Sequence, residues 1–166
     1  MRRRILIVMA VMFGAVSAVT GIYMLGMRSG NRIVREAARR FHRGLGNPIQ
    51  LRAAGATGAF TSVVKHRGRI TGVRYETPVW AMPTEDGFAI ATVYGPGTDW
   101  VRNVLAAGCA TIVHGGETYA VDRPEIVPAE AARAYFPTML RTIHREMGVD
   151  RYLRVRRTDR AEAPAA

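Results

Sequence analysis

The segment VVKHRGRITGVRYETP, residues 63–78, has the pattern of two β-strands joined by a short basic turn. β-Branched residues precede Gly68 and follow Gly72, and glycine lets the backbone reverse direction between them. The basic residues of the segment are Lys65, Arg67, Arg69 and Arg74. Backbone N–H groups at glycines, with guanidinium groups beside them, can bind phosphate or carboxylate oxygens. The turn alone is equally consistent with an anion site and with a solvated hairpin that has charged sides.

Short segments rich in β-branched and aromatic residues recur on both sides of this turn and predict further strands. They are residues 60–66, 73–82, 87–94, 109–114, 117–122 and 152–155. Tight turns are expected at residues 83–87 and at Gly115-Gly116. Helices are predicted from residue 98 or 99 to Gly108, from Pro128 to Pro137, and from there to Gly148.

The order of these segments contains no long βαβ crossover, which argues against a parallel α/β sheet. We therefore predict an α+β domain, mainly β with helices, formed by a small antiparallel β-barrel over residues 51–155. A domain of this size can bury a single core and leave room for one ligand groove. Residues 156–166 are polar and small and are predicted to be a flexible tail.

The N-terminal region has the composition of a membrane anchor. Arg2, Arg3 and Arg4 precede an uncharged apolar run over residues 5–27, which as a helix reaches about 34 Å, against about 30 Å for a hydrocarbon core. Small residues at positions 16–18 leave a cleaved signal peptide as the alternative. We favour an uncleaved transmembrane helix, because the apolar run continues well past these residues.

Residues 28–50 predict a basic amphipathic helix and a linker, with apolar side chains at helical spacing from Ile33 to Leu45. The helix is expected either to lie along anionic lipid headgroups or to pack Phe41 onto the domain. More arginines follow the apolar run than precede it, so the positive-inside rule favours a cytoplasmic domain. We therefore expect a single-pass protein of the cell membrane, with the lipid bilayer as a partner.

The amino-acid composition limits which other classes of binding partner are expected. The 166 residues have a net charge of +11, which favours acidic partners such as anionic lipid or a phosphorylated small molecule. Nucleic acid is not expected, because the aromatic residues are not interleaved with the arginines and much of the charge flanks the apolar run. A single Cys109 excludes an intrachain disulfide. No metal site is expected, since His66 and His114 lie on different predicted strands without a carboxylate partner.

Three segments, HRGRITGVRYETPV, GFAIATVYG and DWVRNVLAAG, follow one another in an order and spacing that resembles the nitroreductase-family deazaflavin-dependent oxidoreductases. The resemblance covers about residues 55–127 and implies a split β-barrel, similar to flavin mononucleotide (FMN)-binding domains, that binds the 8-hydroxy-5-deazaflavin coenzyme F-420. It implies that the glycine-flanked turn cradles the phosphate and polyglutamate tail of the coenzyme. The coenzyme-binding residues implied in this way are Lys65, Arg67, Gly68, Arg69, Thr71, Gly72, Thr77, Pro78, Tyr94, Gly95, Trp100, Arg102 and Asn103.

The chain departs from the family pattern at two places. Many members have a lysine or arginine where this chain has Ile70, and Lys65 or Arg67 could supply that charge instead. Many members also have a basic glycine-containing segment before the tryptophan, whereas residues 94–99 are not basic here and Arg102 is the nearest replacement.

The resemblance implies a reductase that transfers a hydride from the reduced coenzyme to an acceptor. Tyr135 and Tyr152 are the candidate proton donors, although a tyrosine in such a position is more often simply a half-buried core aromatic. A membrane anchor would favour a lipophilic acceptor such as menaquinone, a related quinone, or a nitro or enone compound. The alternatives are an FMN-dependent oxidoreductase of the same barrel class and a non-catalytic module that binds coenzyme or lipid. A barrel of this kind can also pair through its sheet as a homodimer.

Overall fold

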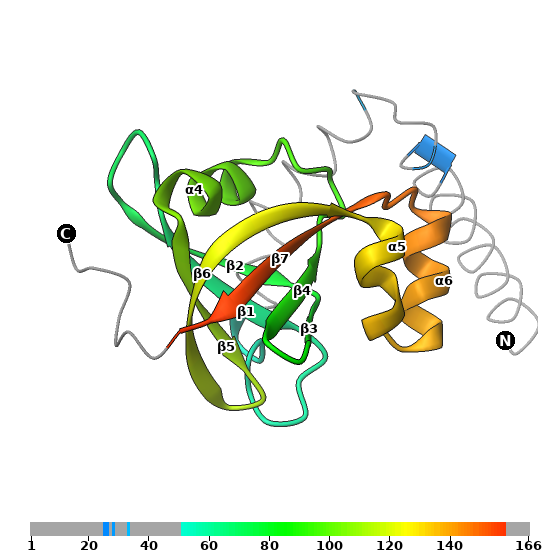
Figure 1. The fold of residues 1–166 in the computed structure, drawn as a ribbon, viewed down its shortest axis with the longest axis horizontal. Coiled ribbons are helices and arrows are strands. Elements are labelled where there is room, and N and C mark those ends of the chain that lie inside the picture. Colours follow the sequence, from blue (N-terminus) through cyan, green and yellow to red (C-terminus); the bar gives the residue numbers. More distant parts are fainter. Residues whose placement is uncertain (1–24, 27, 29–32, 34–50, 159–166) are drawn as a thin grey trace, which may run out of the picture.

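The computed structural model describes residues 25, 26, 28, 33 and 51–158. In this part of the chain the structure is α+β, with one seven-stranded antiparallel sheet and the helices packed against it (Figure 1). The strands are β1 (Ser62–Arg67), β2 (Arg74–Val79), β3 (Ala81–Pro83), β4 (Gly87–Ala91), β5 (Cys109–His114), β6 (Glu117–Pro128) and β7 (Arg151–Arg157). The helices are α4 (Asp99–Ala107), α5 (Ala129–Ala132), the 3₁₀ helix η2 (Arg133–Tyr135) and α6 (Thr138–Glu146).

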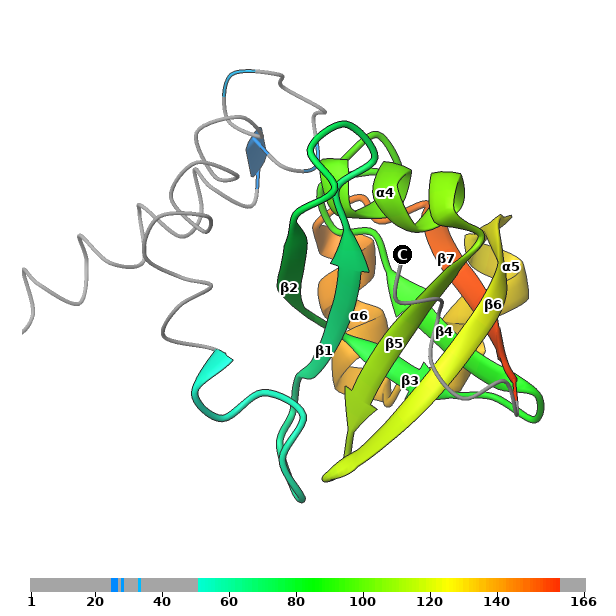
Figure 2. The same ribbon diagram turned by 90° about the vertical axis from the view of Figure 1, so that its left-hand side faces the viewer.

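The sheet curls into a half-barrel, which Figure 2 shows most clearly. Its strand order is β2-β1-β5-β6-β7-β4-β3, so that β2 and β3 form its two ends. These two strands are joined by Trp80 alone, which forces the two ends of the sheet to approach each other. The backbone carbonyl of Trp80 accepts a hydrogen bond from the N–H of Ala91 at 3.0 Å. The predicted strand over residues 73–82 is therefore two strands that belong to opposite ends of the sheet.

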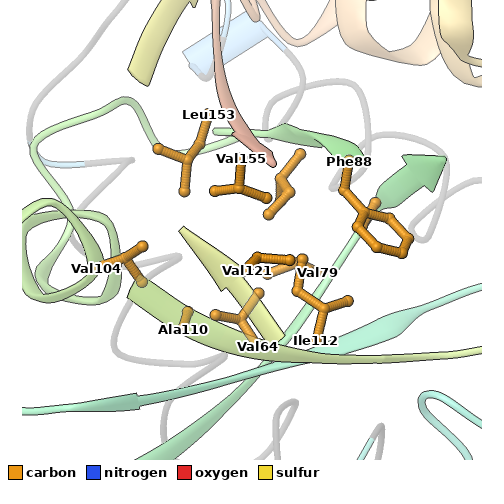
Figure 3. Packing of buried hydrophobic residues seen from close by; sticks show 11 residues of the cluster. Val64, Val79, Phe88, Val104, Ala110, Ile112, Val121, Leu153 and Val155 are labelled. Carbon is orange, nitrogen blue, oxygen red and sulfur yellow. The ribbon is translucent and has the colours of Figure 1, made fainter. Parts of the chain in front are cut away.

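Side chains alternate between two cores along the strands, as the period of two in a β-strand requires. On β4, Phe88 and Ile90 point into the inner core, which Val104 of α4 closes on one side (Figure 3). Ala89 and Ala91 point outward, into a second, outer core formed with α5, Phe136 and α6. The small outward residues allow these helices to lie close against the sheet.

Helix α4 begins and ends where the sequence predicts. Thr98 is its N-cap residue, and Gly108 ends it with φ 70° while donating its N–H to the carbonyl of Val104 at 2.9 Å. A positive φ is the conformation that favours glycine at the end of a helix.

Strand β6 is longer than predicted, because it continues to Pro128 past an irregularity in its pairing with β7. The register shifts between Asp122 and Glu125, and Arg123 between them has φ 49°. Pro124 cannot donate a hydrogen bond to the sheet, so the strand bulges there before pairing resumes.

Strand β7 extends to Arg157, two residues into the segment that was predicted to be a tail, and residues 159–166 lie outside the described residues. The predicted membrane span and basic helix also lie outside them, apart from Leu25, Gly26, Arg28 and Ile33. Within the described residues, no helix combines the length and the hydropathy that crossing a bilayer needs. Arg28 forms an exposed ion pair with Glu146 of α6, with 3.3 Å between Nη1 and Oε2.

Candidate functional site

The turn between β1 and β2 is closed by its own backbone. The N–H of Gly68 donates to the carbonyl of Val73, and the N–H of Gly72 donates to the carbonyl of Gly68, both at 2.8 Å. Gly72 has φ 66°, a conformation that costs glycine little. The hydroxyl of Thr71 accepts a further bond from the N–H of Val73 at 3.3 Å. The turn is therefore compact, with defined internal hydrogen bonds.

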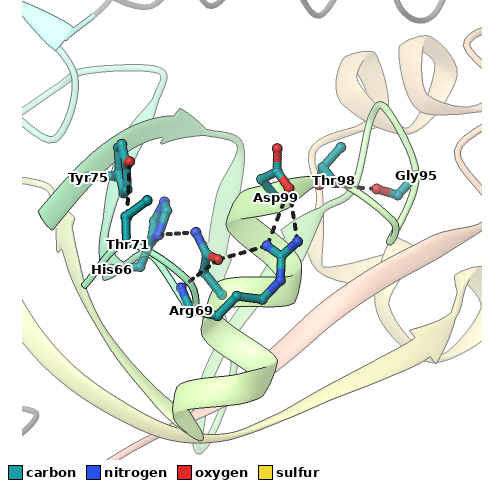
Figure 4. A network of polar contacts seen from close by, with 8 residues as sticks. His66, Arg69, Thr71, Tyr75, Gly95, Thr98 and Asp99 are labelled. Atoms are coloured by element: carbon teal, nitrogen blue, oxygen red, sulfur yellow. Dashed lines mark hydrogen bonds and ion pairs between the residues drawn. The ribbon is translucent and has the colours of Figure 1, made fainter. Parts of the chain in front are cut away.

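Asn103 of helix α4 ties this turn to the rest of the domain. Its Oδ1 accepts hydrogen bonds from the backbone N–H of Arg69 at 3.1 Å and from Nη1 of Arg69 at 3.0 Å (Figure 4). The guanidinium of Arg69 also lies 3.3 Å from Oδ1 of Asp99, one helical turn before Asn103. One face of α4 thus fixes both the backbone and the side chain of Arg69.

His66 of β1 continues this network into the sheet. Its Nδ1 lies 3.2 Å from Nδ2 of Asn103, and its Nε2 lies 3.1 Å from the hydroxyl of Thr77 on β2. The amide Nδ2 is a donor, so Nδ1 accepts and Nε2 bears the proton. Burial lowers the pKa of His66, which favours this neutral form. His66 and Asn103 are both buried, with 8% and 5% of their surface exposed, so these hydrogen bonds are shielded from water.

The remaining charges around the turn are more exposed. Lys65 pairs with Glu76 across the two strands at 3.2 Å. Arg67 lies directly opposite Arg74 in the register of β1 and β2, and like charges in that position repel. Within the described part of the chain, no ion pair is formed by Arg67, by Arg74 or by Arg102 of α4. A bound anion would relieve this repulsion, so the turn is a candidate anion site.

The tip of the turn is apolar. Ile70 is 85% exposed, and Val73 and Tyr75 are exposed as well. The ring of Tyr75 stacks on His66 with 5.8 Å between centroids, and its hydroxyl lies 3.3 Å from that of Thr71. Apolar contact and positive charge are thus both available at one end of the half-barrel.

The segment before α4 completes this end of the domain. Gly95 has φ 87°, and its carbonyl accepts a hydrogen bond from the Thr98 hydroxyl at 3.3 Å. Trp100 packs against the inner core and Tyr94 against the outer core, each partly buried. Pro78 pairs with Val63 inside the sheet. Trp100 and Pro78 therefore belong to the packed structure that supports the β1–β2 turn.

The two tyrosines predicted as proton donors lie elsewhere. Tyr152 of β7 is fully buried in the outer core, where its hydroxyl lies 2.8 Å from Nδ1 of His144. Tyr135 belongs to η2 and is 41% exposed. In Figure 1 the helices α5 and α6 lie at the opposite side of the half-barrel from α4. Among the described residues, no hydrogen bond or ring contact joins either tyrosine to the β1–β2 turn.

Two residues of the network were not among the predicted site residues. The sequence pattern led us to consider His66 only as a metal ligand, and it gave Asp99 no role. Asp99 and Asn103 are one helical turn apart and share a face of α4, which is a signal that the sequence does contain. In the described part of the chain, no three His, Cys, Asp or Glu side chains come together as metal ligands.

Comparison with known proteins adds no family to this description. No protein-family model matches the chain, and a search of the curated proteins finds no match.

Proposed function

We propose that the chain is a membrane-anchored reductase that transfers a hydride from reduced deazaflavin coenzyme F-420 to a lipophilic acceptor, within a split β-barrel similar to FMN-binding domains. The hydrogen bonds between Asn103 and Arg69 are the main support for this proposal. They join the β1–β2 turn to helix α4, and these are two of the segments that resemble the deazaflavin-dependent family. The half-barrel supports the proposal more generally, since its curled sheet agrees with the expected barrel.

The residues of the turn suit the anionic part of such a coenzyme. Arg67, Arg69 and Arg74 would hold phosphate or carboxylate oxygens through charge-assisted hydrogen bonds. Asn103 would keep Arg69 oriented, and the buried neutral His66 would support Asn103. The coenzyme itself supplies the hydride chemistry, and the chain contributes binding and orientation.

The nature of the acceptor follows from the predicted anchor. A domain tethered to a bilayer meets lipid-soluble molecules at a high effective concentration. This favours a quinone such as menaquinone, or a nitro or enone compound that partitions into the membrane, over a soluble metabolite.

Coenzyme binding can be tested directly with the full chain in a nonionic detergent. Reduced coenzyme F-420 is titrated while its fluorescence is followed, and Arg69→Ala is expected to weaken binding about tenfold or more, the range for a lost charge-assisted contact. Arg52→Ala is the matched control, because Arg52 is also an arginine but is exposed and distant in sequence from the turn. Absence of binding by the unmodified chain would reject this function. Oxidation of the bound coenzyme by a menaquinone analogue then tests the reaction.

A non-catalytic coenzyme-binding module is the second candidate. It is favoured by the position of Tyr152, which is fully buried and leaves the turn without the predicted proton donor. Tight coenzyme binding with no turnover over a panel of quinones, nitro compounds and enones would identify this case. A yellow purified protein would instead favour the FMN-dependent alternative.

A further inference from the structure

A second arginine-rich site lies on the helices α5, η2 and α6, away from the β1–β2 turn. There the surface is hollowed into an open pocket of about 440 Å³. Its polar lining consists of Glu130, Arg133, Thr138, Arg141, Thr142 and Arg145. Three guanidinium groups against one carboxylate give this pocket a net positive charge.

The α6 part of the lining forms a single face of that helix. Thr138, Arg141, Thr142 and Arg145 recur at the spacing of three and four residues that places side chains above one another. Nη2 of Arg141 donates to the hydroxyl of Thr138 at 2.8 Å, which holds that guanidinium over the pocket. Hydroxyl and guanidinium donors thus point to the same side of the helix.

Arg133 of η2 contributes the third guanidinium group of the lining. Its Nη2 donates to the carbonyl of Val149 at 2.6 Å, whereas its Nε is buried and has no partner among the described residues. Within the same residues, no carboxylate forms an ion pair with Arg133, Arg141 or Arg145. A partly buried guanidinium that lacks a counter-ion is costly, and a bound anion would offset that cost.

The chemistry of this lining matches a phosphate group. Guanidinium groups bind phosphate oxygens with two parallel hydrogen bonds. The hydroxyl of Thr138 accepts from Arg141 and can donate to a further oxygen, whereas the hydroxyl of Thr142 already donates to the carbonyl of Thr138 at 3.1 Å. The phosphodiester of a phospholipid has two unesterified and two ester oxygens, which together can use more of these donors than the two oxygens of a free carboxylate.

The position of α6 indicates where such a phosphate would come from. Glu146, the neighbour of Arg145, pairs with Arg28, which directly follows the apolar run predicted to span the bilayer. Met139 on α6 and Leu25 beside Arg28 are both strongly exposed, at 57% and 69%. Basic and apolar side chains in this combination are typical of surfaces that contact lipid headgroups.

We propose that the pocket between α5, η2 and α6 binds the phosphate of an anionic phospholipid. The phosphate chemistry depends only on the pocket, whereas the lipid source rests on the membrane anchor of the proposed function. A lipid held here would orient the domain on the bilayer, with the β1–β2 turn at the other side of the half-barrel.

The test uses the full chain in a nonionic detergent and short-chain lipids below their micellar concentration. Binding of dihexanoyl phosphatidylglycerol, dihexanoyl phosphatidylcholine and inorganic phosphate is measured by native mass spectrometry and by the shift in unfolding temperature. We expect phosphatidylglycerol to bind and to raise the unfolding temperature, and Arg141→Gln with Arg145→Gln to weaken binding about tenfold or more. Arg52→Gln removes one charge from an exposed arginine elsewhere and should leave binding unchanged.

Each other result would overturn a stated part of the proposal. Equal binding of phosphatidylglycerol and phosphatidylcholine would reject selection for an anionic lipid, and binding of inorganic phosphate alone would reject the lipid source. No binding of any probe would reject the site. Arg145→Lys is the control for a folding defect, because it keeps the positive charge. It should retain part of the affinity that Arg145→Gln loses. Coenzyme titration of the same samples depends on Arg69, so it reports separately on the proposed function.

Discussion

Asn103 accepts two hydrogen bonds from Arg69, one from the backbone N–H at 3.1 Å and one from the guanidinium at 3.0 Å. A single side-chain oxygen on a helix therefore fixes the conformation of a turn that is 34 residues away in sequence. The amide nitrogen of Asn103 is used as well, since it donates to the buried His66. The order of the turn consequently depends on helix α4.

Replacement of Asn103 by Ala should destabilise the domain by about 2–4 kcal/mol, because His66 and the N–H of Arg69 lose their buried partner. Chemical unfolding measures the free energy, and hydrogen exchange of the amides of residues 68–73 should accelerate. Leu105→Ala on the exposed side of α4 is the control and should cost much less. An unchanged exchange rate in the turn would contradict the role given to Asn103.

Asp99→Asn should strengthen anion binding at the turn. The carboxylate lies 3.3 Å from the Arg69 guanidinium and competes with any bound phosphate. The Asp99 side chain is 60% exposed, so water weakens its attraction for Arg69 and the gain is expected to be only about two- to fivefold. Titration with reduced coenzyme F-420 at two salt concentrations checks this, because the difference should shrink as salt increases. Weaker binding by the variant would show that Asp99 orients Arg69 rather than competes for it.

Ile70→Arg should be tolerated by the fold, because the side chain of Ile70 is 85% exposed at the tip of the turn. If the turn holds the polyglutamate tail, the added charge should raise affinity about threefold or more for the coenzyme, with a larger gain for longer tails. Ile70→Gln is the matched polar control without charge. Equal affinities of the two variants would place the tail elsewhere.

Gly87→Ala should prevent normal folding, at a cost of about 3 kcal/mol or more. A Cβ at Gly87 would collide with the carbonyl oxygen of Val155 and the backbone of Arg156 in the neighbouring strand β7. Gly97→Ala is the comparison, since the nearest atom to its added Cβ is the end of the Arg102 side chain at 3.7 Å. Unfolding temperatures of the two variants should differ widely, and similar values would refute the close approach of β4 and β7.

His144 should make the domain sensitive to acid. Burial, and to a lesser extent the charge of Arg133, lowers its pKa from 6.5 to about 4. The unfolded chain takes up a proton as the pH falls through 6.5, whereas folded His144 stays neutral until about pH 4, so stability is lost between these values. The loss from this one group is roughly 3 kcal/mol. The pH dependence of unfolding should therefore be shallower in His144→Gln, and an equal dependence would contradict this assignment.

The sequence predicts most of the strands and helices because their signals are local. The alternation of side chains around Phe88, the cap at Thr98 and the glycine at position 108 each depend on neighbours in the chain. The break at Trp80 has no such signal, because tryptophan itself favours strands and the break arises where two ends of a curled sheet meet. The long β6 was missed for a similar reason, since Pro124 normally ends a strand.

The site was predicted only in part. The glycines and arginines of the turn are contiguous in sequence and could be recognised together. The contact between His66 and Asn103 joins residues 37 apart and depends on how α4 packs over β1, so no local pattern predicts it. The burial of Tyr152 likewise depends on α6, whose His144 provides the partner for its hydroxyl.

Strand β7 is the last strand in sequence, yet it lies between β6 and β4 in the sheet. Before it is in place, β2-β1-β5-β6 and β4-β3 are two separate sheets connected through Trp80 and the chain from β4 to β5. The half-barrel can therefore be completed only after the chain has been synthesised beyond Arg157. Until then the edges of β6 and β4 that later pair with β7 remain unpaired. A nascent chain that stalls before this point is therefore expected to be bound by chaperones.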